Sequence, residues 1–551
     1  MKKRKKILFC TEASFLPTGY SVYSKEVMSR LHCMPEFEVA ELACYIDDNN
    51  PSIPSVPWKI YPNQPLQNGP DWGTYQSSPS FQFGEYKFNS VLLDFMPDFV
   101  VDIRDWWMIE FEARSPFRDL FHWSIMPTVD AFPQNPQWVS TYASANAVFT
   151  YSEFGRDTLL EQCDDIKYKG IASPCASANF KPVTNKVQHK ESMGISGNIF
   201  LIGTVMRNQK RKLYPDLFRV FRKFLDETKA IDTYLYCHTC YPDVGWDIPR
   251  LLQEFDLTHR VLFTYQCNLC HEIQPNFFKD SFTFCKKCGK FSSHMAGINN
   301  KVEEDDFCKI YNLFDIYMQY ANSEGFGMPQ LEAAQCGVPV MSVEYSAMES
   351  VINNIKGIAL KPLALNRECE TGCYRAVPNN ADTIEKLIEL YSNLDALPAI
   401  GAKIRENTLA HYNWDKTAHV WAQHFHETKT LDHTQTWLSP PQIFTPATTP
   451  PPQDISATDQ TNYLFERVLG KPQWIGNFLW KRTVRDLTYQ RMVESTHRDF
   501  YFNESHNITS SGTAASQPFN IEKAYKSFCD LRESFNMWEQ TRHENIVRRE
   551  L

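Results

Sequence analysis

The sequence lacks the apolar stretches that membrane spans and secretory signals require. Its 551 residues contain no run of 18 consecutive apolar residues, and only four apolar residues lie between the basic start and Thr11. A signal peptide needs a longer apolar region. We therefore expect a protein without a membrane span that is located in the cytoplasm, with residues 7–10 forming a first buried strand.

Two other absences exclude common classes of ligand. No Gly-x-Gly-x-x-Gly turn follows the first predicted strand, which argues against a dinucleotide-binding dehydrogenase. The chain also has little excess charge, with 56 lysines and arginines against 65 acidic residues and a formal net charge of −9. This balance excludes a surface that wraps DNA generally, so any contact with a polyanion must be local.

Short apolar runs, separated by amphipathic stretches, divide the first 438 residues into two similar halves. The runs "FVVDI", "HWSIMP" and "NAVFTYS" in the first half, and "NIFLIGTVM", "DTYLYCHT" and "RVLFTYQ" in the second, are typical of buried parallel strands. They predict an α/β fold of two Rossmann-like, doubly wound parallel sheets, in domains of residues 1–185 and 186–438. Ligands of such sheets bind beyond the carboxyl ends of the strands, so the domains should face a cleft.

A proline-rich segment follows the second predicted domain. Residues 439–453, "SPPQIFTPATTPPPQ", have the composition of a linker. Residues 454–551 are helix-prone, aromatic and charged, which predicts a helical C-terminal extension. The sequence leaves the role of this extension open and is compatible with an oligomer formed through it.

Two glutamates, Glu324 and Glu332, flank a glycine-containing loop. Pro329 suits the first turn of a helix and Gly337 its end, which predicts a helix over about 329–336. Bare backbone amides and the amino end of a helix suit a phosphate, while carboxylates accept hydrogen bonds from sugar hydroxyls. A capped surface helix is the alternative interpretation. The loop residues that we assign to binding this phosphate- and hydroxyl-bearing ligand, the donor of the reaction considered below, are Gly325, Phe326, Gly327 and Met328.

A basic loop is predicted after an earlier strand, in "GTVMRNQKRKLYPDL". Arg207 and Lys212 stand five positions apart there, and they would supply the cations that a departing diphosphate requires. Two cations and a helix end make a catalytic divalent metal unnecessary. The remaining basic residues of this region are expected to be solvated: Lys210, Arg211, Arg219, Arg222 and Lys223.

These two segments together resemble the donor domain of retaining glycosyltransferases of family 4, which have the GT-B fold; a bacteriophage-type member would fit. The resemblance implies that Arg207 and Lys212 bind the donor pyrophosphate. It also implies that Glu324 contacts the transferred sugar and that Glu332 contacts the nucleotide ribose. The expected activity is transfer of a hexose from a nucleoside diphosphate sugar, with UDP favoured, to an acceptor hydroxyl.

The first half resembles the acceptor domain of the same family. Gly19, in the first glycine loop "TGYSVYSKEVMSRL", would lie near the donor phosphate. Asp130 would lie at a strand end facing the cleft and orient the sugar or the acceptor, with Asp102 and Asp105 as weaker candidates. A strand-end acid that caps a loop is the alternative for all three. A catalytic motif containing histidine is not evident in this half.

A cysteine-rich segment interrupts the second half. Residues 266–300 contain two Cys-x2-Cys pairs separated by fourteen residues, a spacing typical of a zinc ribbon. Four thiolates close a tetrahedral site, so we expect a structural zinc that takes no part in catalysis. The four predicted ligands are Cys267, Cys270, Cys285 and Cys288.

Two questions stay open in the sequence. The acceptor could be a glycan, a protein or modified DNA. The zinc ribbon and the basic, aromatic "KPQWIGNFLWKRTVRD" favour, as the alternative function, a nucleic-acid-binding protein.

Overall fold

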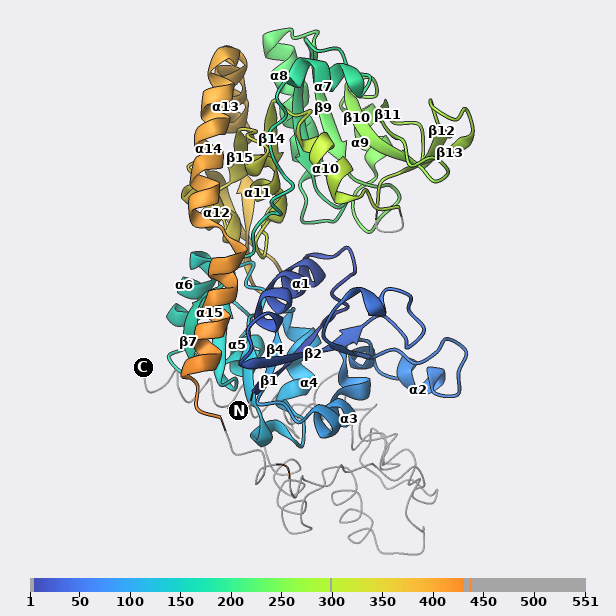
Figure 1. Ribbon diagram of the computed structural model, residues 1–551. Helices are drawn as coiled ribbons and strands as arrows, with labels where there is room; N and C mark the ends of the chain where they lie inside the picture. The colour runs from blue at the N-terminus through green and yellow to red at the C-terminus, as the bar shows by residue number, and fades with distance from the viewer. Residues whose placement is uncertain (1–3, 298–299, 431–436, 438–551) are drawn as a thin grey trace, which may run out of the picture. The chain divides into compact units, whose positions relative to one another are not determined.

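The computed structural model describes residues 4–297, 300–430 and 437 (Figure 1). The predicted linker, 439–453, and the predicted helical extension, 454–551, lie outside the described residues. One compact unit comprises Met1–Asn135 and Thr141–Trp437, and every contact discussed below lies within it. None of the described helices combines the length and the apolar character that crossing a membrane requires.

The first sheet is built from the first half of the chain. Its strand order is β3-β2-β1-β4-β5-β6-β7, and all pairings are parallel. The order reverses between β1 and β4, which is the switch point where doubly wound sheets bind ligands. The strands are β1 Lys5–Glu12, β2 Phe37–Cys44, β3 Lys59–Pro62, β4 Phe99–Asp102, β5 His122–Ile125, β6 Ala147–Thr150 and β7 Tyr168–Ile171.

The second sheet repeats this arrangement. Its parallel part has the order β10-β9-β8-β14-β15-β16, which again places the switch point beside the first strand of the unit. These strands are β8 Phe200–Val205, β9 Thr233–His238, β10 Val261–Cys267, β14 Ile316–Gln319, β15 Val340–Val343 and β16 Ile358–Leu360. A separate antiparallel hairpin follows, made of β17 Pro362–Arg367 and β18 Tyr374–Pro378.

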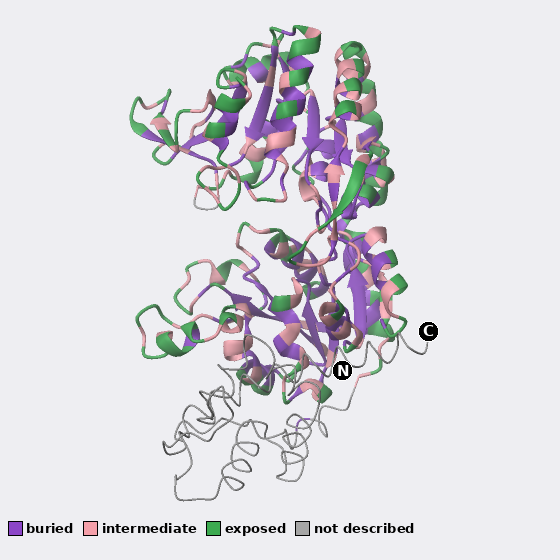
Figure 2. Ribbon diagram, turned by 180° about the vertical axis from the view of Figure 1, so that it is seen from behind, coloured by how far each residue is buried: buried purple, intermediate pink, exposed green. Residues whose placement is uncertain are grey.

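Helices connect the strands of both sheets. The apolar runs bury their strands almost completely, as Figure 2 shows, because a parallel sheet is covered on both faces. The principal helices of the first half are α1 Gly19–His32, α3 Glu85–Phe95, α4 Trp106–Ala113, α5 Pro136–Ala143 and α6 Glu153–Gln162. Those of the second half are α7 Lys186–Ser192, α8 Tyr214–Thr228, α9 Ile248–Glu254, α10 Glu304–Tyr311, α11 Met328–Gln335, α12 Ala347–Ile355, α13 Asn380–Tyr391, α14 Leu397–His411 and α15 Trp414–Glu427.

Helix α15 returns to the first sheet although its sequence follows the second. Trp421 on α15 is fully buried and donates a hydrogen bond of 2.8 Å to the hydroxyl of Tyr23 on α1. The ammonium of Lys5 on β1 donates to the carbonyl of His426 near the end of α15 at 3.2 Å and to that of Thr428, just beyond the helix, at 2.9 Å. The end of the described chain is therefore anchored on the first half.

The cysteine-rich segment extends the second sheet. Its strands are β11 Ile273–Phe277, β12 Phe282–Phe284 and β13 Phe291–Met295. Both β11 and β13 pair antiparallel with β10, so the sheet predicted to be parallel is mixed at this end. Tyr265 and Met295, opposite each other in the β10–β13 pairing, are buried in the core of the second half. The insertion is thus continuous with the sheet that carries it.

Candidate functional site

Glu324 lies just beyond the carboxyl end of β14. Its side chain is 6 % exposed, and Gln319, the last residue of β14, donates a hydrogen bond of 2.8 Å to its Oε1. Its backbone amide donates to Ser346 Oγ at 2.9 Å. The carboxylate is therefore fixed from two sides at the edge of the sheet where the sequence predicts the ligand.

Two neighbouring cations share this carboxylate. Lys212, also 6 % exposed, contacts Oε1 of Glu324, and Arg211 Nη1 lies 2.6 Å from Oε2. Burial and the Arg211 guanidinium lower the pKa of Lys212, and Asp130 opposes them. Contact with the Glu324 carboxylate likewise favours the charged ammonium.

Backbone pairing brings the basic loop to the glutamate loop. Leu213 N donates to Tyr320 O at 3.0 Å, and Asn322 N donates to Arg211 O at 2.9 Å. Lys212 consequently forms an isolated antiparallel bridge with Ala321. Residues 211–213 and 320–322 are therefore held together, which places Lys212 and Glu324 side by side.

Arg207, the other predicted cation, is held by a different partner. Its Nε and Nη2 each lie 3.0 Å from a carboxylate oxygen of Asp243, and its side chain is 43 % exposed. The structure thus joins Lys212 with Glu324, while it pairs Arg207 with an acid that the sequence did not single out.

Both glycines of the loop stand where a side chain would be strained or would clash. Gly327 has φ +87°, which disfavours a side chain, and a Cβ on Gly325 would lie 2.3 Å from Cγ2 of Thr128. Helix α11 starts at Met328, one residue earlier than predicted. Phe326 is 7 % exposed and packs into the core rather than lining an open surface.

Glu332 lies on α11 and accepts a hydrogen bond of 2.5 Å from the hydroxyl of Tyr311. Burial raises the pKa of Glu332 to about 7; the Tyr311 hydrogen bond opposes this shift, and Glu304 adds to it. A bound ligand whose hydroxyls donate hydrogen bonds to the Glu332 carboxylate would favour the ionised form of that carboxylate.

The loops of the first half contribute polar groups near Thr128. Gly19 opens α1, where Thr18 caps the helix, and a Cβ on Gly19 would meet nothing within 4 Å. The hydroxyl of Tyr20 lies 2.8 Å from Thr128 Oγ1. Burial raises the pKa of Asp105 to about 6, against hydrogen bonds to Thr128 and Tyr20. Since Thr128 also approaches Gly325, these groups adjoin the glycine loop.

Asp130 lies two residues beyond Thr128 and forms an ion pair with Arg375. Arg375 Nη1 is 2.8 Å from Asp130 Oδ2 and 2.7 Å from Ser323 Oγ. Asp130 therefore lies beside the residue that precedes Glu324. Asp102, in contrast, is fully buried in an ion pair with Arg104 within the first sheet, which supports a structural role for this acid.

The four predicted metal ligands converge. The Sγ atoms of Cys267, Cys270, Cys285 and Cys288 all lie within 4.8 Å of one another, and two pairs are 3.7 and 3.6 Å apart. Tetrahedral zinc with Zn–S bonds of 2.3 Å requires sulfur atoms about 3.8 Å apart. The backbone amides of Leu269 and Cys270 approach Cys267 Sγ at 3.4 and 3.5 Å, as donors that stabilise a thiolate. The thiol geometry fits a tetrahedral metal ion.

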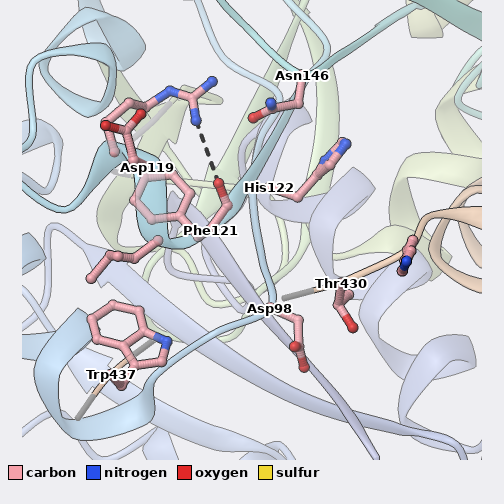
Figure 3. A pocket seen from close by; sticks show the side chains of 10 residues that line it. Asp98, Asp119, Phe121, His122, Asn146, Thr430 and Trp437 are labelled. Atoms are coloured by element: carbon pink, nitrogen blue, oxygen red, sulfur yellow. Dashed lines mark hydrogen bonds between the residues drawn. The ribbon is translucent and has the colours of Figure 1, made fainter. Parts of the chain in front are cut away.

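A polar cavity of about 270 Å³ lies away from these residues, at the amino edge of the first sheet. Figure 3 shows Asp98, His122 and Trp437 among its lining. Asp98 and His122 stand at or just before the starts of strands β4 and β5. Doubly wound sheets bind ligands at the opposite edge, so this cavity is not part of the candidate site.

Two cations of the site were not identified from the sequence. Arg211 was expected to be solvated, whereas it contacts Glu324; Arg375 stands in a hairpin with no motif. In the sequence, Arg211 could have been noticed because it stands next to Lys212. Whether Arg211 also contacts Glu324, however, depends on the backbone pairing between two distant segments, which the sequence does not show. For Arg375 the sequence contains no such signal.

Comparison with known proteins finds a family model that matches part of the second half of the chain. The family model described as glycosyl transferases group 1 matches residues 293–395. A serotype-specific mannosyltransferase, WbdA of Escherichia coli, is 22 % identical over 138 residues. The match spans 25 % of this chain and only 15 % of that curated relative.

Solved structures extend the likeness to most of the chain. Sucrose-phosphate synthase of Thermosynechococcus elongatus has a TM-score of 0.56 and 14 % identity, over 77 % of this chain and 99 % of that one. HepE of Anabaena, solved with UDP and glucose, has a TM-score of 0.55 and 12 % identity, over 77 % of this chain and 100 % of that one. The chain therefore has the GT-B fold predicted from its sequence, and its residues 293–395 match the family model of group 1 glycosyl transferases.

Proposed function

We propose that the protein is a retaining glycosyltransferase that moves a hexose from a nucleoside diphosphate sugar, UDP-hexose in the first place, to an acceptor hydroxyl. The observation that carries this proposal is the cluster of Lys212, Arg211 and Glu324 at the carboxyl end of β14. The complex of the related fold with UDP and glucose supports the choice of donor.

The cations of this cluster would stabilise the leaving diphosphate. Lys212 and Arg211 would exchange the Glu324 carboxylate for phosphate oxygens, and the amides at the start of α11 would add donors. Arg207 would approach the same group after leaving Asp243. Charge stabilisation by these groups needs no divalent ion, so we propose none in catalysis.

The carboxylates would recognise hydroxyls. Glu324, once its cations turn to the diphosphate, would accept hydrogen bonds from the transferred sugar, and Glu332 from the ribose. Asp130 would orient the acceptor or the sugar from the other side of the Ser323 hydroxyl. Attack and departure on the same face of the sugar would give retention.

Zinc would have a structural role. The four thiolates of the cysteine cluster would complete its coordination, which leaves no open position for substrate. Because Cys267 ends β10, Cys270 lies in the turn after it, and the other two ligands lie in the β12–β13 turn, the metal would fasten the insertion to the second sheet.

The direct test is binding and turnover of UDP-glucose by the purified chain. We expect UDP to stabilise the folded chain by a free energy of RT ln(1 + [L]/Kd) and thereby to raise its melting temperature. We also expect the chain to release UDP slowly from UDP-glucose when no acceptor is present. Lys212→Ala should abolish both effects, whereas Lys210→Ala, whose ammonium is exposed, should keep them. A chain that binds no nucleoside diphosphate and splits no nucleotide sugar would refute the proposal.

A second candidate function is docking of a nucleic acid, as an acceptor or as a separate ligand. Phe282, Phe284 and Phe291 are 45, 64 and 61 % exposed and adjoin one another on the β12–β13 hairpin. The exposed turn between these strands carries three lysines. Aromatic rings beside cations suit stacked bases and phosphates. Salt-sensitive retardation of a single-stranded oligonucleotide, lost in Phe284→Ala, would support this function, and its absence would exclude it.

A further inference from the structure

The β17–β18 hairpin contacts both halves of the candidate site. Tyr374 N donates to Phe132 O at 2.8 Å, which ties β18 to the segment that carries Asp130. Two residues later, Ala376 N donates to Asn322 O at 3.0 Å, next to the glutamate loop. Strand β18 is thus hydrogen-bonded to the backbone of both halves of the candidate site.

A tyrosine reinforces this connection. The hydroxyl of Tyr345, which follows β15, donates to Tyr374 O at 2.7 Å and accepts from Phe132 N at 3.4 Å. The segment at Phe132 is therefore bonded to the hairpin directly and also through a side chain of the second half. The site depends on the hairpin for this link.

Arg375 stands at the centre of the link. Its side chain is 15 % exposed, and its guanidinium meets two carboxylates, Asp130 at 2.8 Å and Glu368 at 3.2 Å. The same Nη1 also donates to Ser323 Oγ at 2.7 Å. A planar fork that is fixed by Glu368 on one side can hold Asp130 in one orientation on the other.

We propose that Arg375 is a positioning residue that holds Asp130 at a fixed place beside Ser323 and Glu324. The proposal rests on the proposed function, because it gives Asp130 a role in sugar or acceptor orientation. It adds that the hairpin, which belongs to the donor-side half, sets the position of the acceptor-side acid. Loss of Arg375 would then impair turnover while leaving the diphosphate cations in place.

The first measurement needs no activity. Hydrogen exchange of the ligand-free chain should become faster at residues 128–133 in Arg375→Met, because Asp130 loses its partner. Arg367→Met is the matched control, since Arg367 stands on β17 of the same hairpin and its guanidinium donates to Gly372 O at 2.9 Å rather than to Asp130. This control should leave exchange at 128–133 unchanged.

The second measurement separates positioning from folding. With UDP-glucose as the donor, Arg375→Met should lower the rate of UDP release about tenfold or more while the Kd of UDP changes less than about twofold. Arg375→Lys should restore part of the lost rate, because a lysine ammonium can still pair with Asp130 although it lacks the planar fork of arginine.

A double variant makes the test decisive. Arg375→Met should have no further effect on the rate in an Asp130→Asn background, because each change by itself already removes the same interaction, the ion pair between Arg375 and Asp130. Additive losses would overturn the proposal even where UDP still binds. If UDP fails to bind the unmodified chain, the proposed function fails, whereas unchanged exchange at residues 128–133 rejects the positioning role by itself.

Discussion

Replacing Glu324 by glutamine tests whether the ion-pair cluster is built as described. Glu324 and Lys212 are each 6 % exposed, and Arg211 is the second cation on the same carboxylate. Removing one partner of a buried ion pair costs about 3–5 kcal/mol, since the other charge is left uncompensated. For domains of this size each kcal/mol lowers the melting temperature by about 2–4 °C, so we expect a fall of roughly 6–20 °C.

The fall should depend on pH with a definite sign. Burial and Arg211 lower the pKa of Lys212 in the intact chain, and loss of the neighbouring carboxylate should lower it further, so the folded variant binds fewer protons than the unfolded chain. The deficit should therefore be largest below the folded pKa of Lys212 and shrink as pH rises above it. Glu344→Gln, on a partly exposed glutamate nearby, should show neither the fall nor the trend.

Ligand binding should move in the opposite direction. Glu324 competes with a diphosphate for Lys212 and Arg211, so the variant should bind UDP at least as tightly as the unmodified chain. UDP should also raise its melting temperature more. Scanning fluorimetry and calorimetric titration measure both effects. A variant with unchanged stability and weakened UDP binding would show that Glu324 does not restrain these cations.

Three further predictions concern the other groups. Arg207→Ala should lose about 2–4 kcal/mol of transition-state stabilisation in sugar transfer, whereas Lys210→Ala should lose little; equal rates in the two variants would contradict the role of Arg207. UDP affinity should rise between about pH 6 and 8, because ribose hydroxyls favour ionised Glu332, whose pKa is raised to about 7, and Glu332→Gln should abolish this trend in calorimetry. Elemental analysis should find one zinc per chain, lost in Cys285→Ser and retained in Cys33→Ser on an exposed cysteine.

The sequence predicted the architecture well because buried parallel strands have a local signature. "FVVDI" and "DTYLYCHT" became β4 and β9, and the helix after the glycine loop began within one residue of its predicted start. Proline and glycine restrict the backbone at their own positions, so the boundary of α11 could be derived from its own residues.

The contacts of the site were harder to derive. Asp243 with Arg207, and Arg375 with Asp130, pair residues 36 and 245 positions apart. Hydrophobic periodicity carries no information about such pairs, because they depend on how loops from different strands converge. The β17–β18 hairpin was likewise missed, since β17 exposes most of its residues and lacks a buried apolar run.

The pairing of β10 with the cysteine-rich insertion also bears on solubility. Strand β10 would be the last strand of its parallel sheet, and β11 pairs with Leu262–Gln266 along the edge that β10 would otherwise present to solvent. An uncovered edge strand with apolar residues such as Leu262 and Phe263 invites pairing with another chain. If zinc fastens the insertion, chains that have lost the metal should self-associate through β10, and aggregates in zinc-poor preparations would then arise from this exposed edge.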